Sequence, residues 1–253
     1  MGRASIEVRS DVGWIGPGQS FNIIVVVSPD KDWHVYWKNP GASGAPTVIE
    51  IDAPEGFKVG EPIFPRPSIF RTSDGSTYGY SELVAIFVPV TAPQTIDDET
   101  ATFEITTSWL ACKKICVLGE NETKFTMSTN PKTQGPLHRD LRLVRWQKLL
   151  PNPLSDLDGG KCHIDNNTLH ISGTSDDRVV SFIGVERLGI RFGKPTPTVV
   201  QGGSFSMHIP LTLDFSAVDG EPIVVEGLLT VGRNRSDPSY VVRIIANPEI
   251  EIR

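Results

Sequence analysis

Two of the three cysteines lie in the stretch Trp109-Leu110-Ala111-Cys112-Lys113-Lys114-Ile115-Cys116-Val117-Leu118-Gly119-Glu120. Residues 102–110 before them have the composition of a β-strand, and β character resumes after Cys116. Three residues between two strands form a short hairpin loop, so we expect Cys112 and Cys116 to face each other across the ladder. Opposed Cβ atoms lie about 4.5–5.5 Å apart, against about 3.5–4.5 Å in a disulfide, so the pair can close with some strain.

This cysteine pair has two interpretations. A strained, exposed disulfide is readily reduced, and the loop residues Lys113 and Lys114 favour thiolate over thiol, which predicts a redox-active pair. Most disulfides in exported proteins are instead structural, although a cross-link that closes so short a loop contributes little stability. The spacing differs from the CxxC of thioredoxin-like proteins, so that motif is not invoked.

Length and charge limit the class of protein. With 253 residues the chain can form one large domain or two small ones, and its net charge of -6 argues against a nucleic-acid function. No apolar run approaches the roughly 20 residues that span a bilayer. Because residues 1–5 lack the apolar core of a signal peptide and strand-like sequence follows at once, we expect a trimmed mature segment.

The first half of the chain reads as many short strands. We expect strands at residues 6–8, 21–27, 34–37, 47–51, 57–59, 83–90, 102–110 and 124–127, and an irregular stretch over residues 62–80. Short strands with frequent turns and no helix are typical of an antiparallel sandwich. The pattern therefore predicts that residues 1–130 form one β-sandwich domain.

The pattern of apolar and polar residues changes after residue 130. Residues 136–150 read as one helix with Leu137, Leu141, Val144 and Leu149 on one face and a solvated basic face opposite, within a linker over residues 131–155. Strands return at residues 168–172, 179–183, 204–213, 223–231 and 240–246, which predicts a second sandwich over residues 156–253. The expected fold class is all-β, with two sandwich domains joined by a linker with one helix.

Three motifs together resemble a known family. They are Trp33-His34-Val35-Tyr36-Trp37-Lys38-Asn39-Pro40-Gly41, then Tyr78-Gly79-Tyr80, then the cysteine stretch 109–120. In this order they resemble the N-terminal periplasmic region of the DsbD thiol:disulfide interchange proteins. The ScsB-like branch is the more similar one, because its cysteines have a similar three-residue gap. The resemblance covers residues 5–128 well and the second half more weakly.

The resemblance implies an immunoglobulin-like first domain and a function in electron transfer. Cys112 and Cys116 would take electrons from a membrane-embedded thiol reductase domain and pass them to oxidised periplasmic redox proteins, as a protein-disulfide reductase domain does. One thiolate would attack the partner's disulfide and the other would resolve the mixed disulfide, with their order undetermined. No cofactor beyond the dithiol is implied, and the expected location is the bacterial periplasm.

The resemblance also implies a loop that shields the cysteines. Residues 68–80 would form this cap, with Phe70, Tyr78 and Tyr80 as candidate shielding residues. The chain departs from the family in having neither a transmembrane segment nor a thioredoxin-like domain in its sequence, which leaves the electron donor open. The rival hypothesis is a non-enzymatic β-sandwich for binding or adhesion, with a structural disulfide.

Other residues are read as structural. Cys112, Cys116, Cys162 and His163 would make a Cys3His zinc set, but adjacent strand residues such as Cys162 and His163 point to opposite faces, so no metal site is expected. Cys162 is expected to be a lone thiol. The aromatic cluster 33–37 is read as core, and His34 as structural rather than as a base. The sequence leaves open whether His34 approaches the cysteines in space and lowers a thiol pKa.

Overall fold

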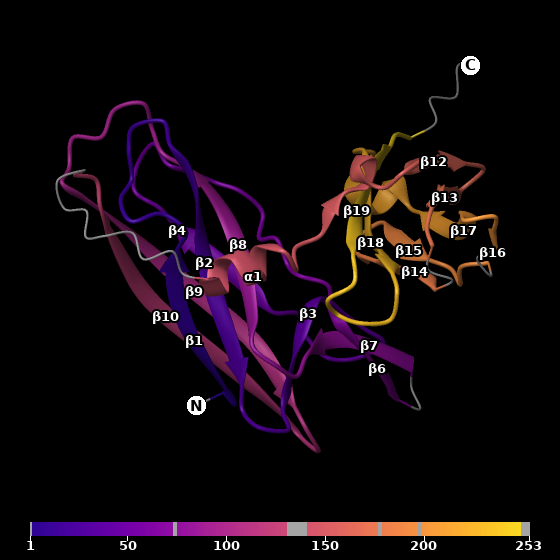
Figure 1. Cartoon of the computed structure of the whole chain (residues 1–253), viewed down its shortest axis with the longest axis horizontal. Coiled ribbons are helices and arrows are strands. Elements are labelled where there is room, and N and C mark those ends of the chain that lie inside the picture. The colour runs from indigo at the N-terminus through magenta and orange to yellow at the C-terminus, as the bar shows by residue number, and fades with distance from the viewer. Residues whose placement is uncertain (1, 73–74, 131–140, 177–178, 197–198, 249–253) are drawn as a thin grey trace. The chain divides into compact units, whose positions relative to one another are not determined.

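The chain divides into two compact units, Met1–Leu150 and Pro151–Arg253. Their structure is a computed structural model that describes residues 2–72, 75–130, 141–176, 179–196 and 199–248. Figure 1 draws the first unit in indigo to magenta and the second in orange to yellow. No helix within these ranges is both long and apolar enough to cross a bilayer. Each unit is described by itself below.

The first sheet of unit 1 is built around a continuous apolar run. Its strands are β1 (Ala4–Ser10), β2 (Ser20–Pro29), β8 (Val84–Thr91) and β5 (Lys58–Val59), in the order β1-β2-β8-β5. The five residues 23–27 of β2, Ile-Ile-Val-Val-Val, are all buried, although alternate side chains of a strand point to opposite faces. Both faces of this sheet are therefore covered.

Helix α1 (Leu141–Gln147) covers one of those faces. Leu143, Trp146 and the following Leu150 pack against a buried cluster of Ile24, Val26, Ala85 and Phe87. The predicted apolar face was wrong, because Leu141 is 71% exposed and Val144 is 40% exposed. The i, i+3, i+7 spacing of Leu143, Trp146 and Leu150 forms the buried stripe instead. Residues 131–140, including Leu137, lie outside the described residues.

The second sheet of unit 1 carries the cysteines. Its order is β10 (Cys116–Ser128), β9 (Thr100–Cys112), β3 (His34–Gly41), β7 (Gly75–Tyr80) and β6 (Ser68–Thr72), and β4 (Val48–Asp52) also pairs with β9. Residues 100–111 of strand β9 alternate, burying Ala101, Phe103, Ile105, Thr107, Trp109 and Ala111. The prediction of an irregular stretch over residues 62–80 was wrong in part, because β6 and β7 pair as an antiparallel hairpin.

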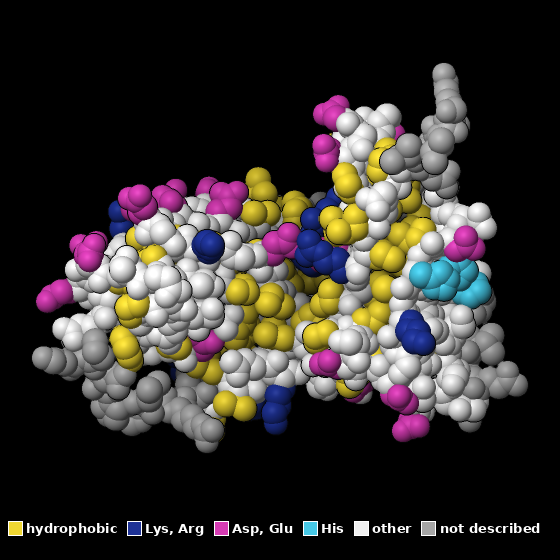
Figure 2. Space-filling view, turned by 90° about the horizontal axis from the view of Figure 1, so that it is seen from above, with side chains coloured by type: hydrophobic (Ala, Val, Ile, Leu, Met, Phe, Trp, Pro, Cys, Tyr) yellow, Lys and Arg dark blue, Asp and Glu magenta, His cyan; other side chains and the backbone are white. Residues whose placement is uncertain are grey.

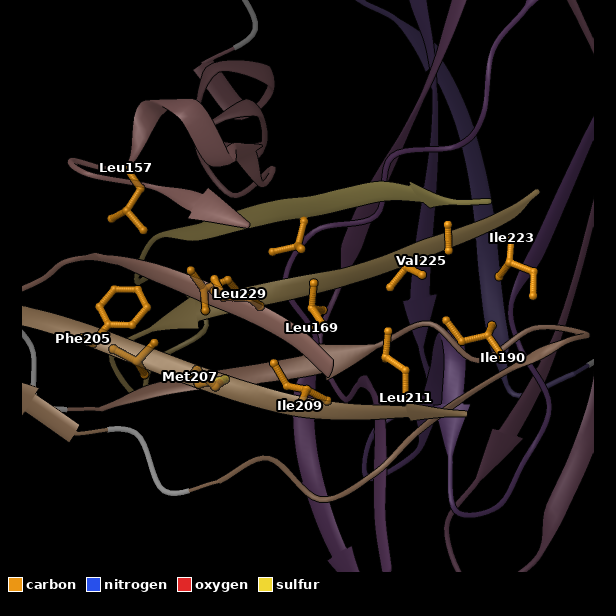
Figure 3. Close-up of a cluster of buried hydrophobic side chains, with 14 residues drawn as sticks. Leu157, Leu169, Ile190, Phe205, Met207, Ile209, Leu211, Ile223, Val225 and Leu229 are labelled. Atoms are coloured by element: carbon orange, nitrogen blue, oxygen red, sulfur yellow. The ribbon is translucent and has the colours of Figure 1, made fainter. Parts of the chain in front are cut away.

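Unit 2 has its own two sheets and its own core. One sheet has the order β11 (Asn152–Pro153), β19 (Ser239–Ala246), β18 (Ile223–Val231) and β14 (Val180–Gly184). The other has β12 (Lys161–Asp165), β13 (Thr168–Thr174), β17 (Ser204–Leu213) and β15 (Ile190–Phe192), with β16 (Val199–Gln201) also on β17. Figure 3 shows side chains of both sheets meeting in one apolar cluster, among them Leu169, Met207, Ile209 and Leu229. The all-β class with two sandwich-type bodies is confirmed, and α1 is the one α-helix of the described residues.

Candidate functional site

The two cysteines lie at the closed end of a long hairpin. Strand β9 ends at Cys112, β10 begins at Cys116, and the register pairs these two residues directly. They form a disulfide with their Cα atoms 4.2 Å apart. The backbone N–H of Lys113 donates to the carbonyl of Ile115 at 3.1 Å and closes the three-residue loop. The expected hairpin and the opposed cysteines are both confirmed.

The two cysteines differ in burial. Cys112 is 4% exposed, whereas Cys116 is exposed at the start of an edge strand. Two large apolar side chains beside Cys116 are also exposed, Ile115 at 67% and Leu118 at 77%. One end of the disulfide is therefore open to a reagent or a protein partner, and the other end is covered.

The hairpin is held in place by an indole packed against a glycine. Trp109 is buried and directly paired with Gly119, where a Cβ atom would collide with the indole ring. The indole Nε1 of Trp109 donates a hydrogen bond to the carbonyl of Gly2 at 2.7 Å. Since only glycine leaves room for the ring, these contacts explain the residue types at both positions and fix the strands that carry the cysteines.

His34 is the neighbour of Cys112 on the other side. The register pairs His34 of β3 with Cys112 of β9, so His34, Cys112 and Cys116 form one row across three strands. Directly paired residues point to the same face of a sheet, with Cβ atoms about 4.5–5.5 Å apart. The sequence left this approach open, because β3 and β9 are far apart along the chain.

Two aromatic rings enclose the imidazole of His34. Phe70 stacks on it, with ring centroids 4.7 Å apart and an interplanar angle of 28°, and Tyr36 meets it edge-on at 5.2 Å. Burial lowers the pKa of His34 from its ordinary value and raises the pKa of Tyr36. Both shifts favour the neutral side chain.

The three candidate shielding residues take different positions. Phe70 is half-buried on His34, next to the cysteine row. Tyr78 meets the ring of Trp37 edge-on at 6.4 Å, and Tyr80 is fully buried with its hydroxyl donating to the carbonyl of Pro65 at 2.6 Å. Of the three candidates, Phe70 is the one with a described ring contact to the row of His34, Cys112 and Cys116. Residues 73–74 of the expected cap lie outside the described residues.

An ion pair joins the cysteine loop to the turn before β3. The ammonium group of Lys113 lies 3.1 Å from a carboxylate oxygen of Asp32, and both side chains are largely exposed. Asp32 has a φ of 67°, in the left-handed region that is typical of turns. Lys113 is therefore partly neutralised, which weakens the sequence argument that it favours a cysteine thiolate.

Cys162 is the free cysteine of the described residues, and it is half-buried beside the core of unit 2. Burial raises the pKa of its thiol, which disfavours the thiolate. Its neighbour His163 stacks on His170 with ring centroids 4.7 Å apart. Across the described ranges, no group of three or more His, Cys, Asp or Glu residues is arranged to hold a metal ion.

Unit 1 is thus a two-sheet β-sandwich that holds a disulfide at the tip of a hairpin, with one cysteine covered and one exposed. Residues 6–128 match the family described as thiol:disulfide interchange protein DsbD, N-terminal. This match confirms the family resemblance of the sequence motifs. A comparison with curated protein sequences finds no significant match.

One solved structure extends the likeness in fold to both units. The N-terminal periplasmic domain of ScsB from Proteus mirabilis is 16% identical, with a TM-score of 0.62, over 97% of this chain and 94% of that one. The reduced N-terminal domain of DsbD from Neisseria meningitidis is 15% identical, with a TM-score of 0.33, over 51% of this chain and 86% of that one. At 16% sequence identity, the match with the ScsB domain shows a shared fold.

Proposed function

We propose that this chain is a periplasmic thiol–disulfide exchange module that works through Cys112 and Cys116. One observation carries the proposal. The disulfide closes a three-residue hairpin loop with its Cys116 end exposed, where a partner can reach the sulfur without unfolding of the sheet. A cross-link that closes so short a loop removes little conformational entropy from the unfolded chain, so stabilisation alone is a weak reason for it. The match of residues 6–128 to the DsbD N-terminal family supports the same function.

The difference in burial between the two cysteines supports one order of action, with Cys116 attacking first. In the reduced module, the exposed Cys116 thiolate attacks a disulfide of the partner, forms a mixed disulfide and releases one partner thiolate. Cys112 then loses its proton and attacks the Sγ atom of Cys116. The internal disulfide re-forms and the second partner thiolate leaves. Two electrons pass from the dithiol to the partner, and the partner's two sulfurs take up two protons.

Phe70 is proposed as the shield of the covered cysteine. Its ring lies on His34, which is paired with Cys112, so movement of the β6–β7 hairpin would uncover this end of the row. Tyr78 and Tyr80 would hold the base of that hairpin through their contacts with Trp37 and Pro65. A shield of this kind limits reaction with small thiols while it admits a docked partner.

The partners are proposed from the family. Electrons would come from a membrane-embedded thiol reductase domain, and the acceptors would be oxidised periplasmic redox proteins. The dithiol itself carries the two electrons, so the chemistry requires no further cofactor. Unit 2 would act as a scaffold or as a docking surface for these partners.

A redox titration tests the proposal. The chain is equilibrated in glutathione buffers of graded potential, its thiols are alkylated, and the oxidised fraction of Cys112 and Cys116 is read by mass spectrometry. We expect interchange at a potential above about -300 mV, the region of labile rather than structural disulfides. Circular dichroism should show the same β structure in both redox states. A Cys162→Ser variant is the control and should titrate identically.

The rival function is a binding or adhesion module with a structural disulfide. The burial of Cys112 is the observation in its favour. A structural disulfide would resist reduction in these buffers, or its reduction would unfold unit 1. A trapping experiment separates the two functions, because Cys112→Ser should retain a periplasmic redox protein as a mixed disulfide on the exposed Cys116. Absence of any such adduct with Cys112→Ser would favour the rival.

A further inference from the structure

When Cys112 resolves the mixed disulfide, its thiol must lose a proton, and the proposed steps name no group that accepts this proton. Cys112 must become a thiolate before it can attack Cys116, yet Cys112 is 4% exposed and water has little access to it. A buried thiol has a raised pKa and is slow to ionise near neutral pH. A nearby base is therefore the group that the chemistry needs at this position.

His34 occupies that position. It is paired with Cys112 in the register, on the side opposite to Cys116, and paired side chains lie on the same face of the sheet. Phe70 stacks on the imidazole and Tyr36 meets its edge, so two aromatic groups hold the ring. The sequence favoured a structural histidine, and the pairing with Cys112 is the new observation.

We propose that His34 accepts the proton of the Cys112 thiol when Cys112 resolves the mixed disulfide. This inference rests on the proposed exchange function. The thiol proton moves to a ring nitrogen of neutral His34, and the Cys112 thiolate attacks the Sγ atom of Cys116. The disulfide between the two cysteines forms, and the partner's thiolate leaves. The imidazolium then returns its proton to that thiolate or to water.

The surroundings of His34 favour this role. Burial of the ring lowers its pKa, so the imidazole is neutral and able to accept a proton near neutral pH. Among the described residues, the titratable and charged groups that the register, the ring contacts and the loop place near it can be named. They are Cys112 of β9, Cys116 of β10, the neutral Tyr36 of β3, and the Lys113–Asp32 ion pair at the loop, and the face toward β6 is covered by the uncharged Phe70.

Ellman's reagent separates the two sulfur steps in the full-length chain. In a Cys162→Ser background, attack by Cys116 releases one thionitrobenzoate, and resolution by Cys112 releases a second. We expect His34→Gln to slow the second phase about tenfold or more near pH 7, because general bases contribute at least that much. The first phase should be unchanged. The variant and the parent should converge as the pH rises, because the Cys112 thiol then ionises without the help of His34.

Several controls separate a proton acceptor from a merely structural residue. His170→Gln, which removes an imidazole of unit 2, should leave both phases unchanged. Added imidazole should accelerate the second phase of a His34→Gly variant near neutral pH. If His34→Gln does not fold by circular dichroism, the pH profile of the parent still tests the proposal. Its second phase should level off once His34 is neutral, whereas the rate of an unassisted thiol would keep rising with pH up to the pKa of that thiol.

The role of His34 would be overturned if the second phase had the same rate in His34→Gln and in the parent, or if the variant slowed it by the same factor at every pH. Either result would leave the exchange function standing. Absence of a first phase in the parent would instead contradict the exchange function itself. The two failures are therefore distinguishable in one set of traces.

Discussion

Cys112 and Cys116 are chemically equal and structurally different. Alternation along β9 and β10 places both on one face of the sheet, but Cys116 starts an edge strand while Cys112 lies between β10 and β3. The neighbours on both sides cover Cys112 and leave Cys116 open. A pair that looks symmetric in the sequence thereby acquires one covered and one exposed member.

Removal of the Phe70 ring should uncover the resolving cysteine. In the reduced chain, Phe70→Ala is expected to raise the rate at which iodoacetamide labels Cys112 several-fold, because the ring that stacks on His34 is lost. Peptide mapping by mass spectrometry gives the rate at each cysteine. Ile69→Ala is the matched control, since Ile69 directly precedes Phe70 in β6 and is 46% exposed. Equal labelling of Cys112 in the two variants would count against Phe70 as a shield.

The hydroxyl of Tyr80 should contribute to stability rather than to chemistry. It donates to the carbonyl of Pro65 at 2.6 Å in a fully buried setting, so Tyr80→Phe leaves that acceptor without this donor. The expected cost is about 1–2 kcal/mol in the free energy of unfolding by denaturant. The glutathione titration of the cysteines should stay the same. A shifted redox midpoint with unchanged stability would contradict this assignment.

Strands with strong local signals could be predicted from the sequence, and elements that depend on distant contacts could not. Strands β17 and β18 were predicted with their observed bounds, because the Gly202-Gly203 turn precedes one and the Asp219-Gly220 turn precedes the other. Strands β6 and β7 were missed because a Pro-, Gly- and Ser-rich composition masks their pairing. The cysteine hairpin was predicted because its contacts are local, whereas the pairing of His34 with Cys112 joins strands far apart in the chain.

Helix α1 has a buried stripe and an exposed side, and substitutions on the two can be compared. Trp146 packs on the apolar surface of the first sheet, whereas Leu141 is 71% exposed on the other side. Trp146→Ala should lower the free energy of unfolding of unit 1 by about 1–3 kcal/mol, less than for a fully buried tryptophan because the ring is half-buried. Leu141→Ala should change it little. Urea unfolding measures both, and the opposite order would restore the face predicted from the sequence.

A row of three histidines crosses one sheet of unit 2 and should make its stability depend on pH. His163, His170 and His208 are paired in register across β12, β13 and β17, with ring centroids 4.7 and 4.6 Å apart, and Figure 2 shows histidines gathered on this unit. Burial first, and then the neighbouring His208 and His163, lower the pKa of His170, while Asp165 raises it. The neutral ring is favoured in the folded state.

The sign of the pH effect follows from that lowered pKa. The unfolded chain binds a proton at His170 more readily than the folded chain, so stability falls as the pH drops through the ordinary histidine range near about 6.5. The melting temperature of unit 2 should therefore be lower at about pH 5 than at about pH 7.5, and His170→Gln should reduce this difference. An unchanged pH dependence in the variant would show that other groups cause it.

The two units have separate cores, and this predicts which fragments of the chain can fold alone. The cluster of unit 2 draws its buried residues from positions 157–246, and the cluster beneath α1 uses residues of unit 1 alone. Residues 1–150 should therefore fold without unit 2 and keep the redox midpoint of the full chain. Residues 1–130, the domain expected from the sequence, lack Leu143, Trp146 and Leu150 and uncover the apolar surface at Ile24, Val26, Ala85 and Phe87.

The shorter fragment should unfold at lower urea and bind a hydrophobic dye, because loss of this cover exposes apolar surface to water. Circular dichroism, urea unfolding and a glutathione titration of both fragments and of the full chain measure these effects side by side. Equal stability of the two fragments would mean that α1 adds nothing to unit 1. Failure of residues 1–150 to fold would mean that unit 1 depends on unit 2, and the exchange chemistry would then be a property of the whole chain.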